Sequence, residues 1–234
     1  MILYGRNPVR EALRGPRTVS RVWVTQASEK EPWLREIAQG IQTDRATTDE
    51  LQSLAGTPDH QGVVAEVSEY VYADAKQLLE PDDALVLVLD EIQDPHNLGA
   101  LARVAESAGA TGMVIAERRS AEITPAACKA SAGAVEHLRI ARVGNISDFL
   151  VAAKDAGSWV YGAAADGAQP YDTPDYTGKV VLVVGSEGKG MRPKVAKTCD
   201  ALVSIPQRGK IDSLNVSTAT AVLVYAVLRS RGVH

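Results

Sequence analysis

Ile205-Pro-Gln-Arg-Gly-Lys-Ile-Asp-Ser-Leu-Asn-Val-Ser-Thr-Ala-Thr-Ala-Val222 joins the end of a predicted strand to the last predicted helix. The strand is expected to stop at Pro206, because proline has no N–H to give to the ladder of a sheet. Asp212-Ser213-Leu214-Asn215 follows and is rich in side chains that cap helices, with Asp212 or Ser213 as the expected cap. An apolar helix is then predicted from Val216 to Leu228. The polar segment is interpreted either as a helix cap or as half of a ligand site, because polar groups are costly to bury without partners.

Two other polar loops follow predicted strands that are apolar up to their last residue. Ala84–Asp90 and Val180–Val184 have the composition of central parallel strands buried on both faces. The first is followed by a polar turn and a helix predicted from Leu98 to Ala108, and the second by Gly185-Ser-Glu-Gly-Lys-Gly-Met-Arg192. Ligands of open α/β sheets bind outside the carboxyl ends of strands. The sequence therefore predicts an α/β domain in which three polar loops converge on one cleft.

Taken singly, the polar residues of these loops have structural interpretations as well. Asn97 suits a helix cap, and Arg103 suits an i,i+3 partner for Glu106. The glycine-rich loop that contains Glu187 matches neither the Walker A pattern nor the GxGxxG fingerprint. Three such loops in one cleft are harder to explain as coincidental capping, which favours a binding or catalytic site.

The first seventy residues form a smaller α/β unit in this interpretation. Asn7 and Pro8 look like the cap and first residue of a helix; strands are predicted at Val19–Val24 and at 60–67, with a helix at Glu31–Ile41 between them. We therefore predict a domain at 1–70, a linker at 71–83 and a larger domain at 84–234. Three arginines near the start of the chain are spaced by four residues: Arg6, Arg10 and Arg14. They would either bind a phosphate backbone or form a solvated helix face.

Composition limits the partners and the location of the chain. The net charge of −4 over 234 residues gives no global field that would attract nucleic acid. The two cysteines, Cys128 and Cys199, lack a metal-binding pattern, so we expect free thiols and no metal. There is no signal-peptide pattern and no apolar run of transmembrane length, which predicts a cytoplasmic protein without membrane contact.

The three loops resemble the motifs of the SpoU branch of the SPOUT RNA 2′-O-methyltransferases. Asp94-Pro-His-Asn97-Leu-Gly-Ala with Arg103 is similar to motif one, Val183-Val-Gly-Ser-Glu187-Gly-Lys-Gly-Met to motif two, and the opening stretch to motif three. Tyr4-Gly-Arg-Asn-Pro-Val and His60-Gln-Gly-Val-Val-Ala resemble the substrate-binding domain of the RlmB-like group. The resemblance implies an L30e-like N-terminal domain, a catalytic domain with a C-terminal trefoil knot, a homodimer, and S-adenosylmethionine as methyl donor.

The resemblance also assigns roles to residues. It points to Arg103 as the residue that would activate the 2′-hydroxyl. An arginine stays protonated and is a poor general base, so we expect Arg103 instead to hold the substrate phosphate and stabilise the developing alkoxide. Asn97 and Glu187 would orient Arg103 or the ribose. Residues implied to line the reaction site are Asn97, Arg103, Glu187, Ser213 and Asn215, and those implied to contact the cofactor are Gly185, Ile205 and Leu214.

The expected substrate is a guanosine of 23S ribosomal RNA, because the N-terminal domain and its arginines suit structured ribosomal RNA. Two alternatives stay open from the sequence. One is a guanosine-2′-O-methyltransferase that acts on tRNA, and the other is a non-catalytic RNA-binding protein of the same fold.

Overall fold

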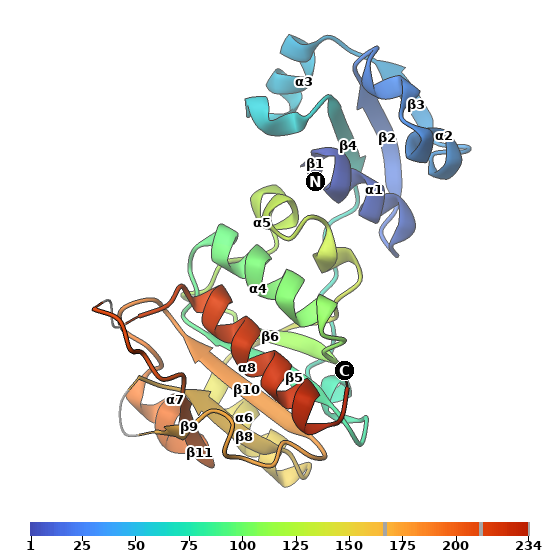
Figure 1. Cartoon of the computed structure of the whole chain (residues 1–234). Helices are drawn as coiled ribbons and strands as arrows, with labels where there is room; N and C mark the ends of the chain where they lie inside the picture. Colours follow the sequence, from blue (N-terminus) through green and yellow to red (C-terminus); the bar gives the residue numbers. More distant parts are fainter. Residues whose placement is uncertain (166–167, 211–212, 234) are drawn as a thin grey trace.

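The computed structural model describes residues 1–165, 168–210 and 213–233 and contains two α/β units (Figure 1). The N-terminal unit has a four-stranded sheet in the order β1-β4-β2-β3. β4 runs antiparallel to β1 and β2, and β3 runs parallel to β2. These strands are β1 (Ile2–Tyr4), β2 (Val19–Val24), β3 (Gln42–Arg45) and β4 (Val63–Val67).

The second unit is built on a seven-stranded sheet in the order β7-β6-β5-β10-β8-β11-β9. All of its strand pairs are parallel, which confirms the predicted α/β class with a parallel sheet. Its strands are β5 (Leu85–Asp90), β6 (Gly112–Ala116), β7 (Ile140–Val143), β8 (Trp159–Ala163), β9 (Gln169–Pro170), β10 (Val180–Gly185) and β11 (Ala201–Ser204). The trefoil knot stays an expectation of the family resemblance.

Helices cover both faces of the parallel sheet, and the alternation of side chains along β5 shows how. Leu87 belongs to a core that includes α4 and α8, which lie side by side in Figure 1. Its neighbour Val88 belongs to a separate core with α6 and α7. The helices are α1 (Arg6–Arg14), α2 (Pro32–Ile37), α3 (Thr48–Ala55), α4 (Pro95–Ser107), α5 (Pro125–Ala130), α6 (Ile146–Asp155), α7 (Pro193–Thr198) and α8 (Val216–Ser230).

Several predicted helix ends were wrong. α1 begins at Arg6, after Gly5 with its φ of 94°, and not after Asn7. α4 begins at Pro95, three residues earlier than predicted, because the Asp94 carboxylate accepts a hydrogen bond from the His96 N–H at 3.0 Å. Asn97 is therefore the third helical residue and caps nothing.

The cap of α8 was also predicted wrongly. Asn215 caps this helix, its Oδ1 accepting from the Ser217 N–H at 2.9 Å, and Ser213 lies before the cap. Asp212, the other predicted cap, lies outside the described residues.

Between β2 and β4, one predicted helix was too long and one strand was missed. The helix predicted at Glu31–Ile41 ends at Ile37, and a strand that was not predicted, β3, begins at Gln42. β3 reads Gln-Thr-Asp-Arg and is largely exposed, so it carries no apolar alternation for a sequence pattern to detect.

A buried ion pair joins the two units. Arg17 Nε donates to Glu136 Oε2 at 2.8 Å, and Arg17 Nη2 pairs with Glu136 Oε1. The exposed fractions of these side chains are 5% and 0%. Nearby, the Tyr70 hydroxyl donates to the Leu138 carbonyl at 3.0 Å. One arginine of the basic N-terminal segment thus holds the domains together.

Glu136→Gln is expected to lower the free energy of unfolding by about 3–5 kcal/mol, because it leaves the buried Arg17 charge uncompensated. Chemical denaturation measures the change. Glu29→Gln breaks the exposed Arg45–Glu29 pair and should cost less than about 1 kcal/mol. Equal losses in the two variants would contradict a stabilising role for the domain junction.

Both cysteines are free, and burial raises the pKa of the Cys128 thiol to about 12. No cluster of metal-binding side chains occurs in the described ranges. Within the same ranges, no helix is long and apolar enough to cross a membrane.

Candidate active site

The candidate site lies at the carboxyl edge of the parallel sheet, where β5 and β10 end side by side. Gly185 is in register with Asp90 across this pair of strands. The chain after Gly185 closes tightly on itself, with the Gly190 N–H donating to the Ser186 carbonyl at 2.8 Å. A Cβ on Gly185 would lie 2.1 Å from the Gly190 carbonyl carbon. No residue other than glycine fits at 185 without moving this loop.

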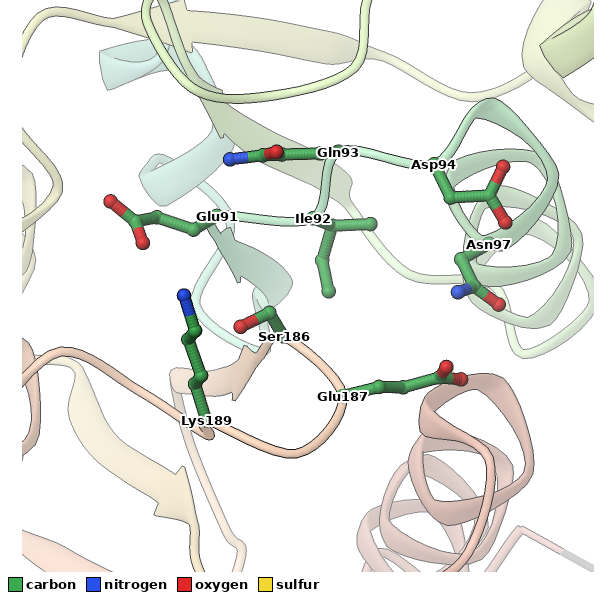
Figure 2. Close-up of a pocket in the computed structure, with 8 residues that line it drawn as sticks. All are labelled: Glu91, Ile92, Gln93, Asp94, Asn97, Ser186, Glu187 and Lys189. Carbon is green, nitrogen blue, oxygen red and sulfur yellow. The ribbon is translucent and has the colours of Figure 1, made fainter.

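A pocket of about 290 Å³ opens between this loop and the turn after β5. In Figure 2 the side chains of Glu91 and Lys189 gather on one side of it, and those of Asn97 and Glu187 on the other. The lining residues are Glu91, Ile92, Gln93, Asp94, Asn97, Ser186, Glu187 and Lys189. Three carboxylates and one ammonium group give the lining a negative balance.

One hydrogen-bond network joins the three polar loops. Asn215 Nδ2 donates to Glu187 Oε1 at 2.6 Å and lies 3.3 Å from Asn97 Oδ1. The Val216 N–H is also 3.5 Å from Glu187 Oε1. Since Asn215 also caps α8, its side chain links the helix start to both other loops. The structure thus brings three of the predicted site residues, one from each motif, into direct contact.

Arg103 does not join this network. It is exposed on α4, and its predicted pairing with Glu106 is not among the ion pairs of the described residues. Six residues along a helix place Arg103 about 9 Å further on than Asn97 and turned by about 120°. The two residues therefore present their side chains on different faces of α4.

The other predicted residues of the third motif flank the network. Ser213 and Leu214 are exposed immediately before α8. Ile205 follows β11 and packs partly buried against the main core. Together with Gly185, Ile205 and Leu214 lie on the two loops that border the β10 and β11 ends.

The arginines predicted to bind RNA are engaged in ion pairs. Arg10 and Arg14 both lie against Glu11, at 2.8 and 3.4 Å, and Arg6 pairs with Glu31 at 3.0 Å. Burial of Glu11 acts to raise its pKa, but hydrogen bonds from Arg10 and His137 outweigh it and lower the pKa. Part of the positive charge of α1 is thus neutralised within the chain.

Sequence reasoning missed two features of the site. The first is an ion pair between Asp90, which is fully buried, and Arg192. The second is Glu91, a pocket residue in the left-handed region with φ of 59°, a conformation that costs energy and clusters at functional sites. An acidic residue at the end of an otherwise apolar strand was the available signal for Asp90, because a buried carboxylate requires a partner.

Family comparisons agree with this geometry. Residues 84–225 match the model of the SpoU rRNA Methylase family. Residues 2–73 match the model described as RNA 2′-O ribose methyltransferase substrate binding.

Individual relatives cover nearly the whole chain. YacO of Bacillus subtilis, whose name places it among TrmH family tRNA/rRNA methyltransferases, is 39% identical over 236 residues, with 97% of this chain and 94% of YacO covered. The uncharacterized tRNA/rRNA methyltransferase slr0955 of Synechocystis is 37% identical over 241 residues; 99% of this chain is covered, but the chain spans only 63% of slr0955.

A solved structure shares the fold. The AdoMet-bound rRNA methyltransferase of Sinorhizobium meliloti superposes with a TM-score of 0.82 at 26% identity, over 97% of this chain and 86% of that one. The pocket, the glycine-restricted loop and the matches over both domains lead to one conclusion. The chain belongs to the SpoU/TrmH family of S-adenosylmethionine-dependent RNA 2′-O-ribose methyltransferases and carries the substrate-binding N-terminal domain of that family.

Proposed function

We propose that this enzyme methylates the ribose 2′-hydroxyl of a guanosine in 23S ribosomal RNA, as expected for the RlmB-like group. The observation that carries the proposed chemistry is the contact between Asn97, Glu187 and Asn215 at the carboxyl edge of the sheet. Support for ribosomal RNA comes from the S. meliloti rRNA methyltransferase of the same fold. The N-terminal domain would bind the RNA, and the enzyme would act in the cytoplasm.

The loops at the ends of β10 and β11 suit the cofactor. Gly185 presents bare backbone because a Cβ would collide with Gly190, and Ile205 and Leu214 border the same edge. These three residues would hold S-adenosylmethionine largely through backbone groups. The cofactor supplies a methyl group activated by a positively charged sulfur, and the carboxylate-rich lining of the neighbouring pocket favours positive charge.

The polar network would orient the nucleotide. Glu187 Oε1 already accepts from Asn215, so its second carboxylate oxygen is available to accept from a ribose hydroxyl. Asn97 lines the same pocket and offers an amide donor. Ser213, exposed before α8, would donate its hydroxyl to the nucleotide.

Arg103 would stabilise the charge that develops on the 2′-oxygen and hold the adjoining phosphate. A permanently charged guanidinium suits both tasks. Since Arg103 faces away from Asn97 on α4, we propose that the enzyme is a homodimer in which Arg103 of one protomer serves the site of its partner. Arg6, Arg10 and Arg14 would exchange their internal ion pairs for RNA phosphates.

The substrate is tested by methylation with labelled S-adenosylmethionine of separate tRNA and ribosomal RNA fractions. The fractions should come from cells that lack the enzyme, because the native site would otherwise already be modified. We expect label in 23S RNA, and mapping of 2′-O-methylation should place it on one guanosine. Label confined to tRNA would instead support the alternative tRNA guanosine-2′-O-methyltransferase.

A further inference from the structure

The glycine-rich loop between β10 and α7 is anchored at its far end by one carboxylate. Asp90, the last residue of β5, accepts two hydrogen bonds from Arg192 and forms an ion pair with its guanidinium. The Arg192 backbone N–H donates to Oδ2 at 2.7 Å, and its side-chain Nε and Nη2 lie 2.8 and 2.7 Å from Oδ1. The Asp90 side chain is fully buried, whereas the Arg192 side chain is 40% exposed.

The near end of the loop is anchored at the same place. Gly185, at the start of the loop, pairs with Asp90 in the parallel ladder. Arg192, at the end of the loop, also contacts Asp90, so both ends of the loop lie at the last residue of β5. Between these points Ser186 and Gly190 form an antiparallel bridge, and Gly190 adopts a φ of 66°. The loop is thus closed at its base by the Asp90–Arg192 pair and within by its own backbone.

The pocket residues of the loop depend on this closure. Ser186, Glu187 and Lys189 line the pocket from the closed part. In Figure 2 Lys189 points toward Glu91, and Glu187 extends toward Asn97. Glu187 in turn carries the hydrogen bond to Asn215. The order of dependence runs from Asp90 to Arg192, to the loop backbone, and then to the network at the pocket.

We propose that Asp90 and Arg192 are positioning residues that hold residues 185–192 in the shape that binds S-adenosylmethionine. Asp90 lies beneath the loop and outside the pocket lining, so it acts through Arg192. The hydrogen bond to Asp90 raises the pKa of the Arg192 guanidinium, so Arg192 stays charged at any pH near neutrality. The inference rests on the proposed placement of the cofactor against Gly185.

The test is calorimetric titration of the purified full chain with S-adenosylmethionine and with S-adenosylhomocysteine. Asp90→Asn and Arg192→Met are each expected to raise the Kd for both ligands at least about tenfold. Arg192→Lys keeps the charge but offers one nitrogen in place of the two that contact Asp90, so its Kd should rise less than that of Arg192→Met. Such rescue by the conservative variant distinguishes positioning of the loop from bulk occupied by a side chain.

Glu136→Gln is the matched control, because Glu136 is a fully buried carboxylate like Asp90 and its ion pair lies away from the loop. Its Kd should stay within about twofold of wild type. The inference would be overturned if Asp90→Asn and Arg192→Met fold and bind with the wild-type Kd. It would also be overturned if Glu136→Gln lost as much affinity as these two variants. If Asp90→Asn fails to fold, the test rests on the two Arg192 variants, because the Arg192 side chain is half-exposed and its replacement should allow folding.

Gly185→Ala separates this inference from the proposed cofactor site. If it weakens binding while the Asp90 and Arg192 variants do not, only the positioning role is wrong. If Gly185→Ala also binds with wild-type affinity, the placement of the cofactor is wrong, and the inference falls with it.

Discussion

Arg103→Ala is expected to lose at least about 100-fold in methyl transfer, because no other group would stabilise the charge on the 2′-oxygen. Its Kd for S-adenosylmethionine should equal that of wild type, since the proposed role of Arg103 is toward the RNA and not the cofactor. Single-turnover transfer to RNA and calorimetry with the cofactor measure the two quantities. Arg229→Ala removes an exposed arginine from α8 and should transfer at the wild-type rate. Wild-type turnover in Arg103→Ala would refute the assignment.

A mixed dimer tests whether Arg103 acts on its own protomer or on the partner. Arg103→Ala and Glu187→Ala subunits, inactive alone, are co-refolded in equal amounts. Half of the dimers then contain one subunit of each kind. If Arg103 acts across the interface, one of the two sites in each mixed dimer has both an intact Glu187 and an intact Arg103. Activity of about a quarter of wild type is expected on random pairing of subunits. No recovery in a verified mixed dimer would place Arg103 at the site of its own chain.

Gly185→Ala is expected to weaken S-adenosylmethionine binding about 10- to 100-fold, because the added methyl group forces the loop apart, and overpacking of this kind costs about 1–3 kcal/mol. The methyl would lie within 2.2 Å of three backbone atoms of Gly190 and Met191. Calorimetry and the ligand-induced shift in melting temperature measure the loss.

Gly144→Ala is the control for that variant. A Cβ at Gly144 would meet only Glu117 Oε2, at 3.8 Å, so binding should be unchanged. Tight binding by Gly185→Ala would show that the cofactor does not depend on the closed form of this loop.

The sequence identified elements whose signal is local. Val180–Val184 is apolar at every position because β10 is buried on both faces, and a short run of this kind is typical of the middle of a parallel sheet. The three polar loops could also be recognised from the sequence. Two of them follow apolar strands, and the third follows a strand that stops at Pro206. Helix ends were harder: Asp94 and Asn215 each competed with neighbouring residues that cap equally well, and only the path of the chain decided between them.

What the sequence could not show depends on pairs far apart in the chain. Arg17 read as one more cation in a basic segment, yet it lies buried against Glu136, 119 residues away. Asp90 and Arg192 are separated by 102 residues, and nothing in either segment names the other. Such pairs follow from strand order within a sheet and from the packing of the two units, which local patterns do not determine.

The network at the pocket also dictates when the site can first exist during synthesis. Asn97 and Glu187 emerge from the ribosome well before Asn215, which is the residue that joins them and starts α8. Chains are made from the N-terminus, and domains fold in that order. A nascent chain would therefore fold its substrate-binding domain while its catalytic centre was still incomplete, and it would acquire activity only when the final helix docked beside α4.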